Sequence, residues 1–307
     1  MQVNVIGATG GAGRAIAEAL VEADLDVVGV DRSGSSPVGR AIGADITTDD
    51  GARAAVVGAD TVVMAAQPPY HRWPEDFPPM LERVMGAAAD VSAKLVMVDN
   101  LYAYGPAEMP ISETTPHRAT DPKGRVRSEM LHALLAAHEV GRLRVAVGQA
   151  SDYVGPHAPR STITALTVDP VAGGGDAARW VGSLDVPHAV AFLPDVARAY
   201  VSLVTDDRAD GQAWVLPHVG APTGREFIAA LAAAAGRPIE AKRLPIWMLR
   251  VAAPFHRDSR ELLGIAHQWT EPWTVDSSAF ESTFGKVERT LLDDAVAATL
   301  HGPGVAR

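Results

Sequence analysis

The stretch Gly7-Ala8-Thr9-Gly10-Gly11-Ala12-Gly13 decides the fold of this chain. It follows a short apolar run at residues 3–6 and opens a helical pattern at residues 13–23. In such a strand–loop–helix unit the first glycine permits a tight turn, the second lets the backbone approach a pyrophosphate, and the third allows close helix packing. The start of the helix favours an anion through its free N–H groups and its dipole. The sequence therefore predicts a dinucleotide-binding loop, against the alternative of a turn without a ligand; its binding residues are Gly7, Thr9, Gly10, Gly11, Ala12 and Gly13.

Outward from this loop, the first half of the chain alternates β-rich runs with helical patterns. Buried strands are expected at residues 26–31, 61–65, 94–99 and 143–148, and a helix at residues 79–91. Strands that alternate with helices form a parallel sheet with helices on both faces. We therefore predict an α/β fold, a Rossmann-type doubly wound parallel sheet with a smaller C-terminal substrate lobe.

The alternation loosens after about residue 150, where glycines and prolines indicate loops. A short strand followed by a helix within residues 186–205 is expected to rejoin the sheet domain. The lobe is expected to hold a helix at residues 223–235, with Thr223 as its N-cap and Gly236 as its C-cap. The predicted Rossmann domain comprises residues 1–155 and about 186–215, and the predicted substrate-binding lobe comprises about 156–185 and 216–307.

Composition narrows the classes of function. The 307 residues are 47% hydrophobic and 21% charged, and the formal net charge is −10. An acidic surface without a basic run argues against nucleic acid and anionic membranes as partners. The absence of cysteine excludes disulfides and thiolate metal sites. No signal peptide or bilayer-spanning run is recognised, so a cytoplasmic protein is expected.

Asp31 is the residue expected to select between NAD and NADP as the cofactor. It ends the second predicted strand, eighteen residues after Gly13. A carboxylate there accepts hydrogen bonds from the adenosine ribose hydroxyls and repels a 2′-phosphate, which favours NAD. Arg32 or Arg14 would bind that phosphate, so NADP stays an alternative. A solvated turn residue is the alternative for Asp31 itself.

Two further segments are expected along the cofactor. Asp45 and Ile46 stand where an adenine contact is expected. Ala65, Ala66 and Gln67 end the strand at residues 61–65 and are expected to lie near the nicotinamide.

The glycine loop and three later segments resemble the short-chain dehydrogenase/reductase superfamily, in its extended or atypical branch of NAD-dependent epimerase/dehydratase-like proteins. Those segments are residues 98–106, 153–156 and 194–199. The resemblance covers most of the chain. It implies a Rossmann domain with bound NAD or NADP, a C-terminal lobe that closes over a small organic substrate, and a homodimer.

The departures from this family concern its catalytic core, a Tyr-x-x-x-Lys pair on a helix and a nearby Ser or Thr. Asp121 and Pro122 suit the N-cap and first turn of the matching helix. The tyrosine position then holds Lys123, the lysine position Arg127, and the Ser or Thr position Asn100. The family's tyrosinate mechanism therefore cannot be carried over.

Lys123 and Arg127 lie four residues apart, on the same helix face as the apolar Met130, Leu131 and Leu134. Both are therefore expected to point toward a cleft or cofactor, against the alternative that they reach solvent around the helix end. The neighbouring guanidinium is expected to lower the pKa of Lys123. Lys123 would then donate a proton to a carbonyl oxygen, or form a Schiff base with a ketone.

Three more residues are candidates for the chemistry around Lys123. Arg127 is suited to bind ribose hydroxyls, an oxyanion or a carboxylate. Asn100 is suited to donate a hydrogen bond to a carbonyl oxygen. Tyr102 is suited to replace the missing tyrosine as the acid, with both cations lowering its pKa, against the alternative of a packed strand-end tyrosine.

Substrate contacts are expected after the strand at residues 143–148, because ligands bind beyond the carboxyl ends of such strands. The candidates are Gln149, Ser151 and Asp152. No metal-ligating pattern is recognised.

These observations favour an NAD(P)-dependent oxidoreductase acting on a small polar carbonyl or hydroxyl compound. Two inward-facing cations favour a polar or anionic small-molecule substrate. The alternatives are an NAD-retaining epimerase, isomerase or lyase, and a non-catalytic NAD(P)-binding sensor.

Overall fold

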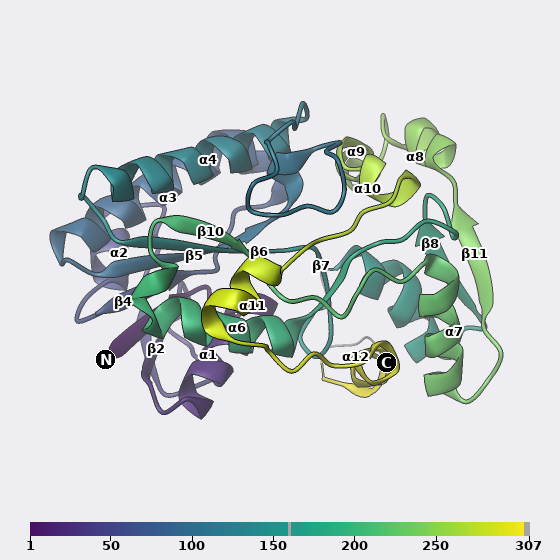
Figure 1. Cartoon of the computed structure of the whole chain (residues 1–307), viewed down its shortest axis with the longest axis horizontal. Helices are drawn as coiled ribbons and strands as arrows, with labels where there is room; N and C mark the ends of the chain where they lie inside the picture. Colours follow the sequence, from purple (N-terminus) through teal and green to yellow (C-terminus); the bar gives the residue numbers. More distant parts are fainter. Residues whose placement is uncertain (159–160, 304–307) are drawn as a thin grey trace.

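The computed structural model describes residues 1–158 and 161–303, and within them a seven-stranded sheet forms the centre (Figure 1). Neighbouring strands of this sheet are all parallel, in the order β10-β6-β5-β4-β1-β2-β3. The chain therefore starts in the middle and winds outward in both directions, which confirms the predicted Rossmann-type fold. The strands are β1 (Gln2–Ile6), β2 (Asp26–Asp31), β3 (Arg40–Gly43), β4 (Thr61–Met64), β5 (Lys94–Asn100), β6 (Val145–Ala150) and β10 (Gln212–Val215).

The predicted central strands all appear within two residues of their expected ends. β3 was not predicted, because this edge strand is largely exposed and lacks an apolar run. β10 was not predicted as a separate strand either. It returns to the sheet beside β6, after the helix α6 (Leu193–Thr205) and a short 3-10 helix at Asp207–Ala209.

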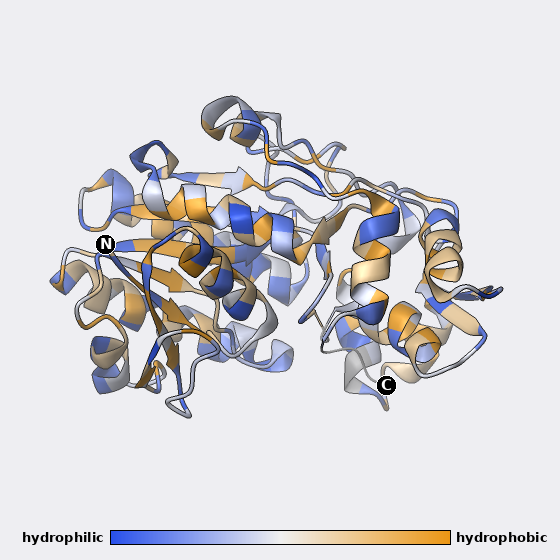
Figure 2. Cartoon of the chain, turned by 90° about the horizontal axis from the view of Figure 1, so that it is seen from below, coloured by the Kyte–Doolittle hydropathy of each residue, from blue (hydrophilic) through white to orange (hydrophobic). Residues whose placement is uncertain are grey.

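Two helical layers cover the sheet. On one face a single apolar cluster joins the sheet to α2 (Asp49–Ala55), α3 (Trp73–Asp90) and α4 (Pro122–Glu139). The other face packs on α1 (Gly11–Glu22) and α6. Figure 2 shows the central strands in hydrophobic colours and the outer helix surfaces in a mixture.

Helix α3 begins at Trp73, six residues before the expected start at residue 79. Pro78 and Pro79 lie inside this helix, which continues through both. Trp73 and Phe77 are fully buried against the sheet, so tertiary packing outweighs the low helix propensity of proline here.

The second half of the chain builds a smaller lobe beside the sheet (Figure 1). Its own apolar cluster joins a parallel strand pair to the helices around it. Thr223 caps α7 in a capping box with Glu226, and Gly236 ends that helix in the left-handed conformation, as predicted. The main elements of the lobe are β8 (Ala177–Val181), α7 (Gly224–Ala235), β11 (Glu240–Leu244), α8 (Ile246–Ala252), α9 (Arg257–Gly264) and α12 (Leu292–His301).

One C-terminal segment lies outside this lobe. Helix α11 (Ser278–Phe284) places Phe280, which is fully buried, in the apolar cluster of α1 and α6. The expected lobe range 216–307 includes this helix, yet its packing belongs to the sheet domain. The remaining domain boundaries stay predictions.

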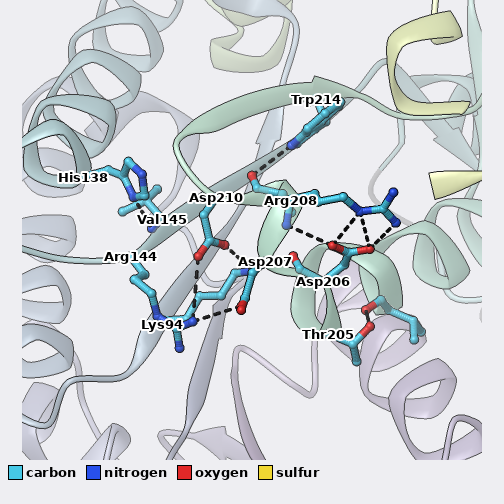
Figure 3. Close-up of polar contacts among 12 residues, drawn as sticks. Lys94, His138, Arg144, Val145, Thr205, Asp206, Asp207, Arg208, Asp210 and Trp214 are labelled. Carbon is cyan, nitrogen blue, oxygen red and sulfur yellow. Dashed lines mark hydrogen bonds and ion pairs between the residues drawn. The ribbon is translucent and has the colours of Figure 1, made fainter. Parts of the chain in front are cut away.

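A buried ion pair lies at the amino end of β5 (Figure 3). Lys94 is 1% exposed, forms an ion pair with Asp210, and donates to the main-chain oxygen of Asp206 at 3.2 Å. Ligands of parallel sheets bind at the opposite, carboxyl ends of the strands. We therefore assign this cluster to the stability of the β5–β10 region and not to ligand binding.

Candidate functional site

A cleft with a volume of about 740 Å³ opens at the carboxyl ends of the sheet strands, between the glycine loop and the lobe. It is large enough for a dinucleotide and a small substrate. Every predicted cofactor and catalytic residue lines it, together with Ser151 and Asp152. The lobe contributes Glu261 and Leu262 from α9 and, after that helix, Ile265, Gln268 and Trp273.

The glycine loop has the geometry that a pyrophosphate requires. Gly7 has a φ of +84°, and a Cβ on it would meet the Ala66 nitrogen at 2.8 Å. A Cβ on Gly13 would lie 2.2 Å from the Gly7 oxygen, so helix α1 packs directly on the turn. The first N–H groups of α1 have no acceptor within the helix, and the N-cap Gly10 offers them no side-chain acceptor. The residues present therefore fit a dinucleotide.

Gly11 has a role that the sequence did not suggest. A Cβ on it would lie 2.0 Å from the main-chain oxygen of His157. The segment after β7 (Asp152–Val154) therefore crosses the start of α1 in direct contact with it. Glycine at this position allows that segment to cover the phosphate loop.

Asp31 stands at the end of β2, next to the loop. Its Oδ1 accepts hydrogen bonds from the Ser33 nitrogen at 2.9 Å and hydroxyl at 2.6 Å, and its Oδ2 accepts from the Thr9 hydroxyl at 2.6 Å. These bonds, those from Ser33 first, lower the pKa of Asp31. An ionised carboxylate is thus held at the place where the ribose was expected, while Arg32 lies exposed beside it.

The adenine and nicotinamide segments also line the cleft. Asp45 accepts hydrogen bonds from the hydroxyl and nitrogen of Thr47, which lower its pKa, and Ile46 beside it is 6% exposed. Ala65, Ala66 and Gln67 follow β4. Their predicted contacts with a cofactor stay predictions.

Lys123 is 6% exposed and is held by the lobe. Its Nζ donates to the main-chain oxygen of Glu261 at 2.6 Å and lies 3.1 Å from the Oε2 of that residue. The same Nζ is 5.2 Å from the ring centre of Tyr70 and 5.7 Å from that of Tyr102. The lowered pKa expected for Lys123 is found, but burial causes it, partly opposed by Glu261; the expectation that Arg127 causes it was wrong.

Arg127 is 3% exposed and is held by a carboxylate, a side-chain amide and two aromatic rings. Its Nη1 lies 3.1 Å from the Oδ1 of Asp99, and its Nη2 donates to the Oε1 of Gln67 at 3.1 Å. The guanidinium lies 4.3 Å from the ring centre of Trp73 and 4.5 Å from that of Phe77. Both predicted cations therefore face the cleft rather than solvent. Lys123 pairs with the Glu261 carboxylate and Arg127 with that of Asp99.

Helix α4 presents these two residues because of its N-terminal capping. The Asp121 carboxylate accepts from the nitrogens of Lys123 at 3.1 Å and Gly124 at 3.0 Å, with Pro122 in the first turn. This is the capping that the sequence predicted.

Asn100 and Tyr102 follow β5 directly. The Asn100 Oδ1 accepts from the Tyr102 nitrogen at 3.0 Å, which leaves its amide NH₂ as a donor for a ligand. Burial raises the pKa of Tyr102 well above its ordinary value, and Arg127 lowers it only to a smaller extent. The expectation that the two cations would lower this pKa was wrong, because desolvation dominates.

Among the substrate candidates, Gln149 does not reach the cleft lining. It is fully buried, accepts from the Tyr104 hydroxyl at 2.7 Å and donates to Asp99 at 2.9 Å. Its amide thus positions Asp99 behind Arg127, and the predicted substrate contact was wrong. Gln149 lies within β6, whereas Ser151 and Asp152 lie past the strand end.

Ser151 and Asp152 do line the cleft. The Ser151 hydroxyl accepts from the Trp273 ring nitrogen at 3.1 Å. Asp152 Oδ2 lies 2.9 Å from the Nε2 of the buried His188.

Sequence reasoning missed Glu261, Asp99 and His188. Glu261 and His188 lie far from the glycine loop in sequence, and no local spacing connects them to it. Asp99 stood next to the predicted Asn100, and its position at the end of a buried strand was a usable signal.

The described residues contain no helix that is both long and apolar enough to span a membrane. They also contain no group of three or more His, Asp or Glu side chains arranged to hold a metal ion.

Several solved structures share this fold. The UDP-glucose 4-epimerase of Bifidobacterium longum, in complex with NAD+ and UDP, has a TM-score of 0.79 at 20% identity, over 98% of this chain and 97% of that chain. The UDP-glucose 4-epimerase of Thermus thermophilus, in complex with NAD, has 0.78 at 17% identity, over 98% of both chains. The UDP-glucuronic acid 4-epimerase of Bacillus cereus, with UDP-glucuronic acid and NAD, also has 0.78 at 17% identity, over 98% of both chains.

A search among functionally curated proteins finds no match. The family model described as NAD dependent epimerase/dehydratase family matches residues 3–216. This range contains the glycine loop, Asp31, and the Lys123–Arg127 pair, and it is more than half of the chain. This match confirms the resemblance to the NAD-dependent epimerase/dehydratase branch, and with it the expectation of NAD as the cofactor of the family. The chain belongs to the NAD dependent epimerase/dehydratase family.

Proposed function

We propose that this enzyme transfers hydride between NAD and a small polar carbonyl or hydroxyl compound, with Lys123 as the proton-transfer group. The observation that carries the proposal is the position of the Lys123 Nζ, buried in the cleft between the glycine loop and the lobe, with its pKa lowered by burial. Because burial lowers the pKa of Lys123, its neutral amine is more accessible than that of a free lysine, and the group can both give and take a proton.

The cofactor, when bound, supplies or accepts the hydride. Gly7, Gly10 and Gly13 would hold its pyrophosphate at the start of α1, and Asp31 its adenosine ribose. Asp31 favours NAD over NADP because its charge would repel a 2′-phosphate.

The residues of the chain handle the oxygen of the substrate. In reduction, hydride adds to the carbonyl carbon while Lys123 passes a proton from Nζ to the oxygen. The amide of Asn100 donates a hydrogen bond to that oxygen. Arg127 stays paired with Asp99 and holds the wall of the cleft beside the substrate oxygen in place. The ring of Tyr70 lies 5.2 Å from the Lys123 Nζ, close enough for a cation–π contact.

The second candidate function is that of an epimerase, which causes no net oxidation or reduction of its substrate. The fold neighbours from Bifidobacterium longum and Thermus thermophilus are epimerases crystallised with NAD. An epimerase would keep NAD bound, oxidise its substrate and reduce it again from the other side. The UDP in the Bifidobacterium longum structure supports a small anionic compound among the substrates to test.

The test compares Lys123→Met with wild type over a panel of carbonyl compounds, following NADH absorbance. General acid–base catalysis contributes about 10²–10⁴-fold, so kcat should fall by at least about 100-fold. Lys242→Met, a change at a largely exposed lysine, is the control. Unchanged turnover in Lys123→Met removes Lys123 from the mechanism. Substrate isomerisation without net NADH change, on cofactor that co-purifies, selects the epimerase. Tight NADH binding without turnover of any compound contradicts both and leaves a sensor.

A further inference from the structure

Asp152 and His188 form a pair at the wall of the cleft. Asp152 begins β7, which runs parallel to β9 (Val190–Phe192), and His188 lies two residues before β9. The Asp152 side chain is 11% exposed and lines the cleft, whereas the His188 side chain behind it is 1% exposed. The carboxylate is therefore the member of the pair that is placed to meet a ligand.

The two neighbours of the His188 ring fix how many protons the pair holds. Nδ1 lies 2.9 Å from the main-chain oxygen of Gln268, and Nε2 lies 2.9 Å from Asp152 Oδ2. A carbonyl oxygen only accepts, so Nδ1 carries a proton. The contact with Asp152 then needs another proton, either on Nε2 or on the carboxyl group. In both arrangements the pair holds one proton more than a carboxylate beside a neutral imidazole.

The aromatic surroundings favour the charged imidazole. The His188 ring stacks on Trp269 with centroids 4.0 Å apart and an interplanar angle of 20°. The indole face attracts a cation. Burial of a charge is costly, but the facing carboxylate makes the pair neutral as a whole.

His218 shows the opposite arrangement nearby. Its Nδ1 donates to the main-chain oxygen of Leu216 at 2.7 Å, and its Nε2 accepts from the nitrogen of Ser151 at 2.9 Å. One nitrogen donates and the other accepts, so this ring is neutral. Burial lowers the pKa of His218 to about 4. His218 therefore serves, within the same protein, as the neutral imidazole with which the protonation of His188 can be compared.

We propose that Asp152 and His188 store one proton at the cleft and that Asp152 is a second acid–base group of the site, distinct from Lys123. This inference rests on the proposed function for the identity of the cleft as the active site. Reduction of one carbonyl group consumes one proton, so the pair acts on a substrate whose carbonyl oxygen lies beside Asp152 rather than beside Lys123. As hydride adds to the carbonyl carbon, the stored proton passes to that oxygen in place of a proton from Lys123. An Asp152 carboxylate and a neutral His188 remain, and solvent returns the proton. Among the residues that the structure describes, Tyr70 and Tyr102 lie within electrostatic range of Asp152, and His218 lies within range of His188.

The direct test is NMR of the NAD-bound protein with ¹⁵N-labelled histidine and ¹³C-labelled aspartate at pH 7.5. We expect both His188 nitrogens to be protonated in wild type, and only one in Asp152→Asn, because the new amide can donate to Nε2. His218 should be neutral in both proteins. A neutral His188 beside a protonated Asp152 carboxyl also supports the stored proton. A neutral His188 beside an ionised Asp152 overturns it, and this wild-type result decides even where the variant fails to fold.

A kinetic measurement tests the acid–base role. For at least one carbonyl compound that wild type reduces, Asp152→Asn should lower kcat by at least about 100-fold, Lys123→Met should lower it less, and NADH affinity should stay unchanged. Asp185→Asn is the control, because that carboxylate is 67% exposed on the lobe. Wild-type kcat in Asp152→Asn with every compound refutes the role. Failure of the proposed function is recognised separately, as absence of turnover in wild type with the NMR result intact.

Discussion

Lys123 of helix α4 and Glu261 of helix α9 join the two parts of the molecule across the cleft, because the Lys123 Nζ contacts both the main-chain oxygen and the carboxylate of Glu261. The sheet domain supplies the cation and the lobe supplies its counter-charge. The charge of the proposed proton-transfer group therefore depends on how the lobe sits against the sheet.

The first prediction concerns Glu261→Gln. Burial lowers the pKa of Lys123 and Glu261 raises it, so removing the carboxylate should lower that pKa further. At a given pH more of Lys123 is then the neutral amine. The measurement is the pH dependence of Lys123 labelling by trinitrobenzenesulfonate, quantified by peptide mass spectrometry. Its midpoint should move to lower pH in the variant. An unmoved midpoint means that Glu261 does not control this charge, and Glu240→Gln, facing the exposed Lys242, is the control.

The second prediction concerns Asp31→Ser. Wild type should bind NADH at least about tenfold more tightly than NADPH, a difference of about 1.4 kcal/mol. The substitution removes the charge that repels a 2′-phosphate, so the ratio should approach one. Titration of cofactor-free protein, followed by nicotinamide fluorescence, measures both affinities. A preference of wild type for NADPH would transfer the selecting role to Arg32 or Arg14. Asp26→Ser, at the exposed other end of β2, should leave the ratio unchanged.

The third prediction compares two glycine substitutions. A Cβ on Gly13 would lie 2.2 Å from the main-chain oxygen of Gly7, whereas a Cβ on Gly86 in α3 meets nothing within 4 Å. Gly13→Ala should therefore destabilise the fold by about 1–3 kcal/mol and weaken NADH binding. Gly86→Ala should stabilise it by about 0.5–1 kcal/mol, because glycine in a helix interior is unfavourable. Urea unfolding measures both, and equal effects would contradict the close packing of α1 on the turn.

The cofactor half of the cleft was predictable because its signals are local. The glycines at positions 7, 10 and 13 need only a preceding strand and a following helix, and Asp31 needs only the next strand. The direction of Lys123 and Arg127 was also readable, since both share a face with apolar residues of α4. These predictions depend on short spacings in the sequence.

The other half depends on contacts between distant segments. Glu261 reaches Lys123 over 138 positions, and His188 reaches Asp152 over 36. No periodicity links such partners. For the same reason the cause of the lowered Lys123 pKa was misjudged: Arg127 was visible in the sequence, whereas the burial that dominates is a property of the folded cleft.

The last prediction concerns the ion pair far from the cleft. Lys94→Met removes the close counter-charge of the largely buried Asp210 and leaves only the more distant Arg144 at 3.9 Å, which should destabilise the fold by about 3 kcal/mol. Lys242→Met breaks an ion pair between largely exposed side chains and should change stability by less than about 1 kcal/mol. Urea unfolding compares the two, and NADH affinity should stay at the wild-type value in both because neither residue lines the cleft. Equal unfolding free energies would mean that water reaches Asp210 and that burial does not set the strength of this pair. A loss of NADH affinity in Lys94→Met alone would instead show that the amino end of β5 is coupled to the cleft through the sheet.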